Sequence, residues 1–126
     1  MSSSNNHNLG LLILRLGFSG LMLTHGIPKL LQVFKGDFSF GNPIGIGEAP
    51  SLILTVIAEF LCPVLIILGI RTKLAAIPPI IVMLVAAFIV HASDPFGRKE
   101  FALLYLLGFL AIAIMGPGKY TLKRLT

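Results

Sequence analysis

The chain has 126 residues, of which 56% are hydrophobic and 12% are charged, and its mean hydropathy is +0.93. A soluble domain of this length cannot bury that much apolar surface, so the composition indicates an integral membrane protein that forms one compact bundle. The net charge of +5 comes from basic residues scattered mostly between apolar runs, a distribution that does not match a nucleic-acid-binding surface. Cys62 is the only cysteine, which excludes an intrachain disulfide and any Cys-pair motif for redox chemistry or zinc.

Residues 1–8 are polar and predict a disordered tail. They carry no Lys or Arg, and no small-residue cleavage pattern follows, so the sequence does not predict a cleaved signal peptide. The first apolar run covers about residues 9–34, which is longer than the ~20 residues needed to cross a bilayer. We expect Pro28 either to kink this helix or to end its membrane-spanning part.

The ionisable residues of the first run share one helix face. At about 100° per residue, Arg15, His25 and Lys29 lie on a stripe with Ser19 and Met22. Such a stripe favours a polar site inside the membrane. The simpler interpretation is that Arg15 and Lys29 extend to the headgroup layers and that His25 is a hydrogen-bonded structural residue. The sequence leaves both interpretations open.

Residues 35–50 form a loop rich in glycine and proline. Phe38, Phe40, Ile44 and Ile46 make this loop too apolar for an ordinary solvated linker. We expect the loop either to cover the mouth of the bundle as a lid or to pack at the level of the headgroups.

The second apolar run, about residues 51–70, carries a carboxylate, Glu59, near its middle. A charged residue at that depth costs roughly 2.5–3.5 kcal/mol on insertion scales. Pro63 has no N–H, so the carbonyl of Glu59 loses its usual helical partner. A carboxylate and a free carbonyl at one depth must face protein or water rather than lipid.

The third run covers about residues 74–92 and ends at His91. Pro78 and Pro79 remove two successive helical donors, which predicts a kink. The fourth run covers about residues 100–116.

A Gly-Pro stop and a basic tail over residues 119–126 follow the fourth run. The four runs predict an all-α, four-helix transmembrane bundle as a single domain over residues 9–118. This topology puts both termini and the 71–73 turn on one side of the membrane. That side carries six Lys and Arg residues against four on the other. The positive-inside rule therefore favours cytoplasmic termini in an inner membrane.

Depth along the helices, at ~1.5 Å per residue, decides which polar residues can meet. Five residues are expected to line one outward-opening cavity: His25, Lys29, Glu59, His91 and Glu100. Arg15 lies about 15 Å deeper than His25 and is expected to balance charge from the inner side; with the five cavity residues it completes the set of candidate ligand-binding residues. Glu59 is expected to pair with either His25 or Arg15, because a partner lowers the cost of burying its charge. Glu59 and His25 are the candidate proton relay.

Several short motifs, taken in order along the chain, resemble the DoxX family of small four-helix bacterial membrane proteins. They are Leu14-Arg15-Leu16-Gly17, His25-Gly26, Lys29-Leu30, Glu59, Gly69-Ile70-Arg71-Thr72, His91 and Gly116-Pro117-Gly118-Lys119-Tyr120-Thr121-Leu122. The last motif departs from the family pattern at Thr121, where serine is usual, and at Lys123, where an acidic residue is usual. The resemblance covers about residues 9–122. It implies a membrane subunit or accessory of an oxidoreductase, similar to the small subunit of thiosulfate–quinone oxidoreductase.

A quinone needs a lipid-accessible slot, a donor for each carbonyl and a proton route. His25 or His91 can supply the donors, and Glu59 or Glu100 can relay the proton. Haem ligation by the two histidines is disfavoured, because both lie near one surface. The chain has no metal, flavin or dinucleotide motif, so we expect no intrinsic cofactor. A partner subunit must then bring the electrons, and the chain alone is not a complete enzyme.

Two other classes of function remain open. The first is a membrane scaffold or assembly factor, in which the buried polar residues confer specificity. The second is a small proton-coupled carrier, which with four spans would need a homo-oligomer to enclose a path.

Overall fold

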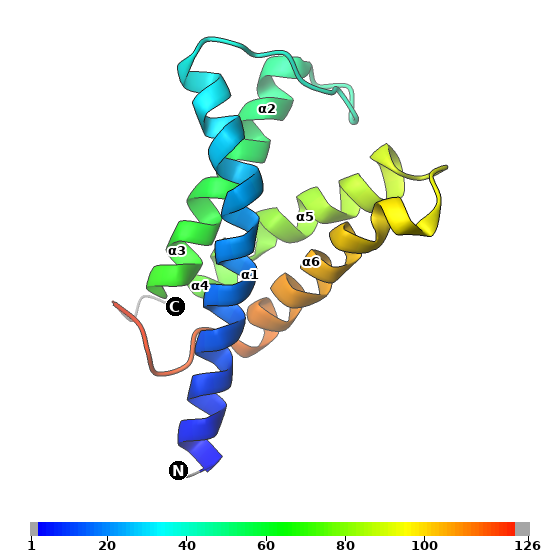
Figure 1. Ribbon diagram of the computed structural model, residues 1–126. Helices are drawn as coiled ribbons and strands as arrows, with labels where there is room; N and C mark the ends of the chain where they lie inside the picture. Colours follow the sequence, from blue (N-terminus) through cyan, green and yellow to red (C-terminus); the bar gives the residue numbers. More distant parts are fainter. Residues whose placement is uncertain (1–2, 123–126) are drawn as a thin grey trace.

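The computed structural model describes residues 3–122, which form four long helical segments and no strand (Figure 1). The first segment is α1, Ser3–Phe34. The second consists of α2, Glu48–Val56, the π-helix η1, Ile57–Leu61, and α3, Cys62–Leu68. The third consists of α4, Thr72–Ala75, α5, Ile77–Val85, and the π-helix η2, Ala86–Val90, and the fourth is α6, Phe96–Met115. The predicted all-α, four-helix fold is confirmed.

The four segments form two antiparallel pairs. Helix α1 runs beside α2, η1 and α3, and α5 runs beside α6 (Figure 1). The two pairs meet near α4 and diverge toward the opposite end, where the loops after α1 and after η2 lie (Figure 1). The start of α1 and the described segment after α6 both lie toward the α4 end, as the four-span topology predicts.

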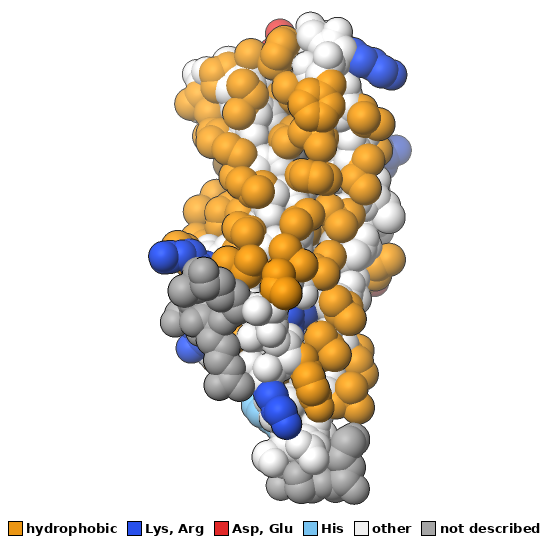
Figure 2. Space-filling model, turned by 90° about the vertical axis from the view of Figure 1, so that its left-hand side faces the viewer, with side chains coloured by type: hydrophobic (Ala, Val, Ile, Leu, Met, Phe, Trp, Pro, Cys, Tyr) orange, Lys and Arg blue, Asp and Glu red, His pale blue; other side chains and the backbone are white. Residues whose placement is uncertain are grey.

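Most of the helical segments have the length and composition of membrane-spanning helices. Within the described residues, three of them are long and apolar enough to cross a bilayer: Ser4–Phe34, Glu48–Leu68 and Thr72–Val90. Helix α6 is 20 residues long and carries three consecutive charged residues, Arg98-Lys99-Glu100, after its first two residues. Figure 2 shows hydrophobic side chains over most of one face of the molecule. A surface of this composition is expected to contact the hydrocarbon of a lipid bilayer rather than water.

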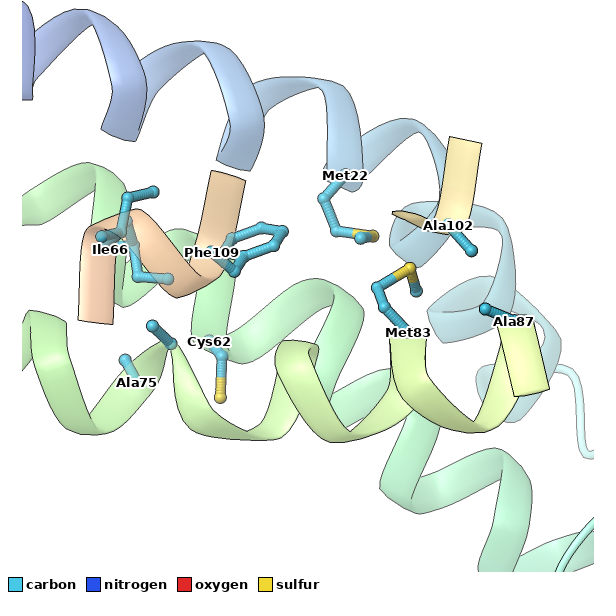
Figure 3. Close-up of a cluster of buried hydrophobic side chains, with 10 residues drawn as sticks. Met22, Cys62, Ile66, Ala75, Met83, Ala87, Ala102 and Phe109 are labelled. Atoms are coloured by element: carbon cyan, nitrogen blue, oxygen red, sulfur yellow. The ribbon is translucent and has the colours of Figure 1, made fainter. Parts of the chain in front are cut away.

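The hydrophobic core lies where the two pairs meet. Phe109, Ile66 and Met22 are almost completely buried and fill its centre (Figure 3). Four small side chains in the core let the helix backbones approach: Ala75, Ala76, Ala87 and Ala102. Gly108 of α6 has the same role, because a Cβ there would overlap the ring of Phe18 on α1. Small residues at helix contacts are the usual packing device inside membranes, since lipid supplies no hydrophobic driving force between helices.

Helix α1 begins at Ser3, earlier than the predicted start near Leu9. The structure therefore places residues 3–8 in the helix rather than in a disordered tail. The side chain of Asn8 accepts a hydrogen bond from the backbone N–H of Lys119, at 2.9 Å, so this first part of the helix contacts the C-terminal segment. Of the predicted basic tail over residues 119–126, Lys123 and Arg124 lie outside the described residues.

Pro63 has the predicted effect on the second segment. The helix accommodates the missing N–H by widening into η1, in which the N–H of Cys62 bonds to the carbonyl of Ile57. The backbone of Gly26 on α1 packs directly against the Glu59 carbonyl that Pro63 leaves without a helical donor. A π-helical turn of this kind is rare and is found frequently at functional sites.

The other prolines are accommodated in two ways. The third segment turns at Ala76, so Pro78 and Pro79 fall in the first turn of α5, where no intrahelical donor is needed. The interruption is thus a turn just before the prolines. Pro28 lies inside α1, which continues to Phe34, so it does not end the helix.

The contact at Gly26 gives a prediction on stability. Changing Gly26→Ala should lower the free energy of unfolding by about 1–3 kcal/mol, because the new methyl group would overlap the Glu59 carbonyl and force α1 away from η1. Gly20→Ala on the same helix is the matched control. A Cβ there meets nothing within 4 Å, so the change should leave stability equal or raise it by about 0.5–1 kcal/mol. Unfolding in mixed micelles measures both. Equal effects of the two substitutions would contradict the packing described here.

Candidate functional site

A cavity of about 340 Å³ lies between the two helix pairs. Helix α1 contributes Met22, His25 and Lys29, the loop after it contributes Phe40, Gly41 and Pro43, and the second segment contributes Thr55 and Glu59. The remaining wall consists of Val82, Met83, Val85, Ala86, Val90, His91, Phe101 and Tyr105. The cavity is therefore mostly apolar and aromatic, with a few polar groups. That composition is typical of a small-molecule site.

Glu59 and Lys29 form an ion pair in the cavity wall, in which the Lys29 ammonium donates to Oε1 of Glu59. Glu59 is 4% exposed, whereas the side chain of Lys29 is 26% exposed and reaches the cavity. The predicted partners of Glu59 were His25 or Arg15, and both predictions are wrong. Lys29 follows His25 by one helical turn on the same face, and this extra turn brings it level with Glu59.

His25 lies between aromatic rings. Its imidazole stacks on Phe101, with ring centroids 6.0 Å apart and planes 14° apart, and it meets the edge of Tyr105 at 5.8 Å. No residue in the described part of the chain hydrogen-bonds this imidazole. The alternative of a hydrogen-bonded structural histidine is thus not what the structure shows. Both ring nitrogens remain available to a ligand in the cavity.

His91 occupies the other side of Phe101. The His91 and Phe101 rings meet edge to face, with centroids 6.4 Å apart. Nδ1 of His91 lies 2.7 Å from Oδ2 of Asp94, three residues later. A carboxylate on one ring nitrogen fixes the orientation of an imidazole and leaves the other nitrogen for chemistry. Asp94 was not among the predicted site residues, although its i, i+3 spacing from His91 was visible in the sequence.

Arg15 does not line the cavity. It is 1% exposed and donates four hydrogen bonds to backbone carbonyls near the end of α3. The acceptors are Ile66 (2.9 Å), Ile67 (2.8 Å), Pro117 (3.0 Å) and Tyr120 (2.6 Å). The first two belong to the last turn of α3, where a helix leaves carbonyls without intrahelical donors, and the Ile66 carbonyl also accepts from the N–H of Gly69 at 3.1 Å. Arg15 therefore joins α1, the end of α3 and the C-terminal segment.

Glu100, the fifth residue of α6, is exposed and does not line the cavity. Phe101 and Tyr105 line the cavity instead. Phe101 follows Glu100 by one residue, so its side chain points about 100° further around the helix. The i, i+4 spacing of Phe101, Tyr105 and Phe109 was the available signal for this aromatic face.

The loop after α1 lies against the cavity, since Phe40, Gly41 and Pro43 contribute to its wall. Polar groups hold it in place: the Phe40 N–H donates to Oε1 of Glu48 at 3.1 Å, and the Gln32 side chain donates to the Ser39 carbonyl at 2.6 Å. Hydrogen bonds from Ser39 also lower the pKa of Asp37 at the start of the loop. The loop therefore forms one wall of the cavity.

The described residues contain no group of three or more His, Cys, Asp or Glu side chains placed to hold a metal ion. The polar side chains that line the cavity are Lys29, Glu59, the two histidines and the hydroxyl-bearing Thr55 and Tyr105. Lys29 can donate to an oxygen, the histidines can donate or accept, and Glu59 can take up a proton. Phe101 and Tyr105 offer flat surfaces to a planar ligand.

Comparison with known proteins gives one match. The family model described as DoxX matches residues 10–92, which is more than half of the chain. The matched region runs from the start of α1 past His91 and includes the Lys29–Glu59 pair, whereas α6 lies outside it. No curated protein and no solved structure matches the chain.

Proposed function

This chain belongs to the DoxX family, and on that premise we propose that it is the membrane subunit or accessory of a quinone-linked oxidoreductase. The observation that carries the proposal is the convergence of four ionisable residues on one aromatic-walled cavity. His25, Lys29, Glu59 and His91 come from three different helical segments, and all four line it.

The cavity suits a quinone head group in size and shape. Its volume of about 340 Å³ lies at the lower end of the roughly 300–1,000 Å³ range of small-molecule pockets, which suits a single substituted ring. Phe101 and Tyr105 provide the faces against which a planar ring packs. The two quinone oxygens need donors, and Lys29 with either histidine supplies them.

Protons and electrons follow different routes in this proposal. Glu59 and His25 relay protons to and from the bound ring, and the Asp94–His91 pair connects the cavity with the loop surface. Electrons come from a partner subunit, which supplies the redox cofactor, so the chain alone is not a complete enzyme. Quinone is the ligand and no cofactor is built into the chain.

We place the protein in the bacterial inner membrane with both termini in the cytoplasm. Arg15 and Lys29 are engaged inside the bundle, so only the remaining Lys and Arg residues count toward orientation. Five of them lie on the side of the termini and three lie on the other side. This distribution supports the same orientation as the full count.

The proposal predicts that His25→Leu weakens quinone binding about tenfold, the equivalent of one hydrogen bond of about 1.4 kcal/mol. Binding of a short-chain quinone to the purified chain, measured by calorimetry in detergent, tests this. His7→Leu is the matched control, because His7 is exposed on the same helix and does not line the cavity. Unchanged affinity in His25→Leu, or an equal loss in His7→Leu, would remove His25 from the site.

A further inference from the structure

A second, smaller cavity of about 120 Å³ adjoins the first one. It lies between α2 and α5 and beneath the loop after α1. The residues that line it are Phe40, Pro43, Ile44, Ile46, Ser51, Leu54, Thr55, Ile81, Val82 and Val85. Its wall is almost wholly apolar. Of its two hydroxyl groups, that of Thr55 already donates to the Ser51 carbonyl at 2.7 Å.

The two cavities are neighbours. They share Phe40, Pro43, Thr55, Val82 and Val85 as wall residues, so a ligand in the larger cavity would meet the smaller one at these side chains. The ionisable groups, Lys29, Glu59 and the histidines, all line the larger cavity, and none lines the smaller one. Polar and apolar recognition are thus separated along one path.

The outer end of the smaller cavity faces the lipid side of the bundle. Leu54 on α2, Ile81 on α5 and Ile44 in the loop line it, and they are 52%, 54% and 53% exposed. Large apolar side chains with that exposure lie on a surface that contacts hydrocarbon. The smaller cavity therefore lies between the polar cavity and the lipid-facing surface of the bundle.

We infer that the smaller cavity holds the apolar chain of the ligand, and that the ligand of this protein is a prenylated, membrane-resident quinone. The head group lies beside Lys29 and Glu59, and the first isoprenoid unit passes between Leu54 and Ile81 to the lipid. The smaller cavity, of about 120 Å³, is lined almost wholly by apolar side chains, which suits a short hydrocarbon segment rather than a second ring. This inference rests on the proposed function and adds the class of quinone and its direction of entry.

Two photoreactive quinones test the inference on the full chain in lipid–detergent micelles. One carries the reactive group on a tail-free ring, and the other carries it on the first isoprenoid unit. Mass spectrometry of peptides identifies the labelled residues, and unlabelled prenylated quinone is the competitor. We expect the ring probe to label residues of the larger cavity. We expect the tail probe to label Ile44, Leu54, Ile81 or their immediate neighbours.

Paired substitutions give the control. Leu54→Trp with Ile81→Trp fills the smaller cavity and should reduce competable tail labelling about tenfold while ring labelling persists. Ile53→Trp with Leu84→Trp places the same residues on the same helices outside both cavities and should leave both signals unchanged.

The outcomes separate the two proposals. Competable ring labelling together with tail labelling on α6, or tail labelling that survives filling of the smaller cavity, overturns the tail assignment and leaves the proposed function standing. Ring labelling that the prenylated quinone does not compete overturns the proposed function itself. If the filled variant fails to insert, the peptides labelled in the wild-type chain decide the question.

Discussion

Replacing Lys29 with methionine is expected to lower the free energy of unfolding by about 3–5 kcal/mol, the cost of leaving one member of a buried ion pair without its partner. Glu59 is 4% exposed, and Lys29 is the only cation within salt-bridge distance of it among the described residues. Unfolding in mixed micelles gives the value. Lys35→Met, in the exposed loop one residue beyond α1, is the control and should change stability by less than about 0.5 kcal/mol.

The double variant Lys29→Met with Glu59→Gln should recover most of the lost stability, because no buried charge is then left unpaired. It should not recover quinone binding, because both polar contacts with the head group are altered. Equal stabilities of the single and the double variant would show that the pair is not coupled in the folded protein. Full quinone binding by the double variant would mean that the pair is only structural.

Replacing Arg15 with leucine is expected to lower the free energy of unfolding by at least about 4 kcal/mol. The substitution removes four hydrogen bonds from a charged donor, each worth about 1.5–3 kcal/mol, and of the four acceptors the Ile66 carbonyl keeps a second donor, the N–H of Gly69. Arg15→Lys should restore little of the lost stability, because an ammonium group cannot reproduce the planar guanidinium that donates to four separate acceptors. Arg98→Leu is the control, since Arg98 is exposed at the start of α6.

Hydrogen exchange locates the effect of Arg15. The N–H of Leu122 bonds to the carbonyl of Leu68 at 2.8 Å, which fastens the C-terminal segment to the end of α3. In Arg15→Lys this amide and its neighbours should exchange faster, whereas amides of α5 and α6 near the cavity should not change. Unaltered exchange over residues 117–122 would show that Arg15 does not hold the segment.

Much of the fold could be predicted because hydrophobic runs and helix breakers act locally. The four predicted apolar runs correspond to the four helical segments, and the π-helical turn η1 ends at Leu61, just before Pro63, where a distortion was predicted. Pro78 and Pro79 show where this reasoning stops. The chain can accommodate the loss of two backbone N–H donors either by kinking one helix or by starting a new helix at the prolines. The packing of neighbouring elements decides which of the two occurs.

The candidate site could be predicted only in part, because contacts between helices depend on rotation and stagger. His25, Lys29, Glu59 and His91 do line one cavity. The partner of Glu59 was misassigned, since one helical turn along α1 separates His25 from Lys29 and no sequence pattern fixes the stagger of two helices to that accuracy.

The contacts of Arg15 could not be predicted for a different reason. Its acceptors are backbone carbonyls of α3 and of the C-terminal segment, which leave no signature in side-chain chemistry. The nearest available signal was Gly69, whose φ of 78° ends α3 and brings its backbone under the guanidinium.

Native mass spectrometry of the chain, taken from its own membranes in a mild detergent, tests the central claim most directly. The account predicts that a prenylated quinone and a flavin-, haem- or iron–sulfur-containing subunit leave the membrane with the chain. It also predicts that Lys29→Met with Glu59→Gln loses the quinone while it keeps the subunit. A homo-oligomer that carries only phospholipid would contradict the account and would make a scaffold or a proton-coupled carrier the better description.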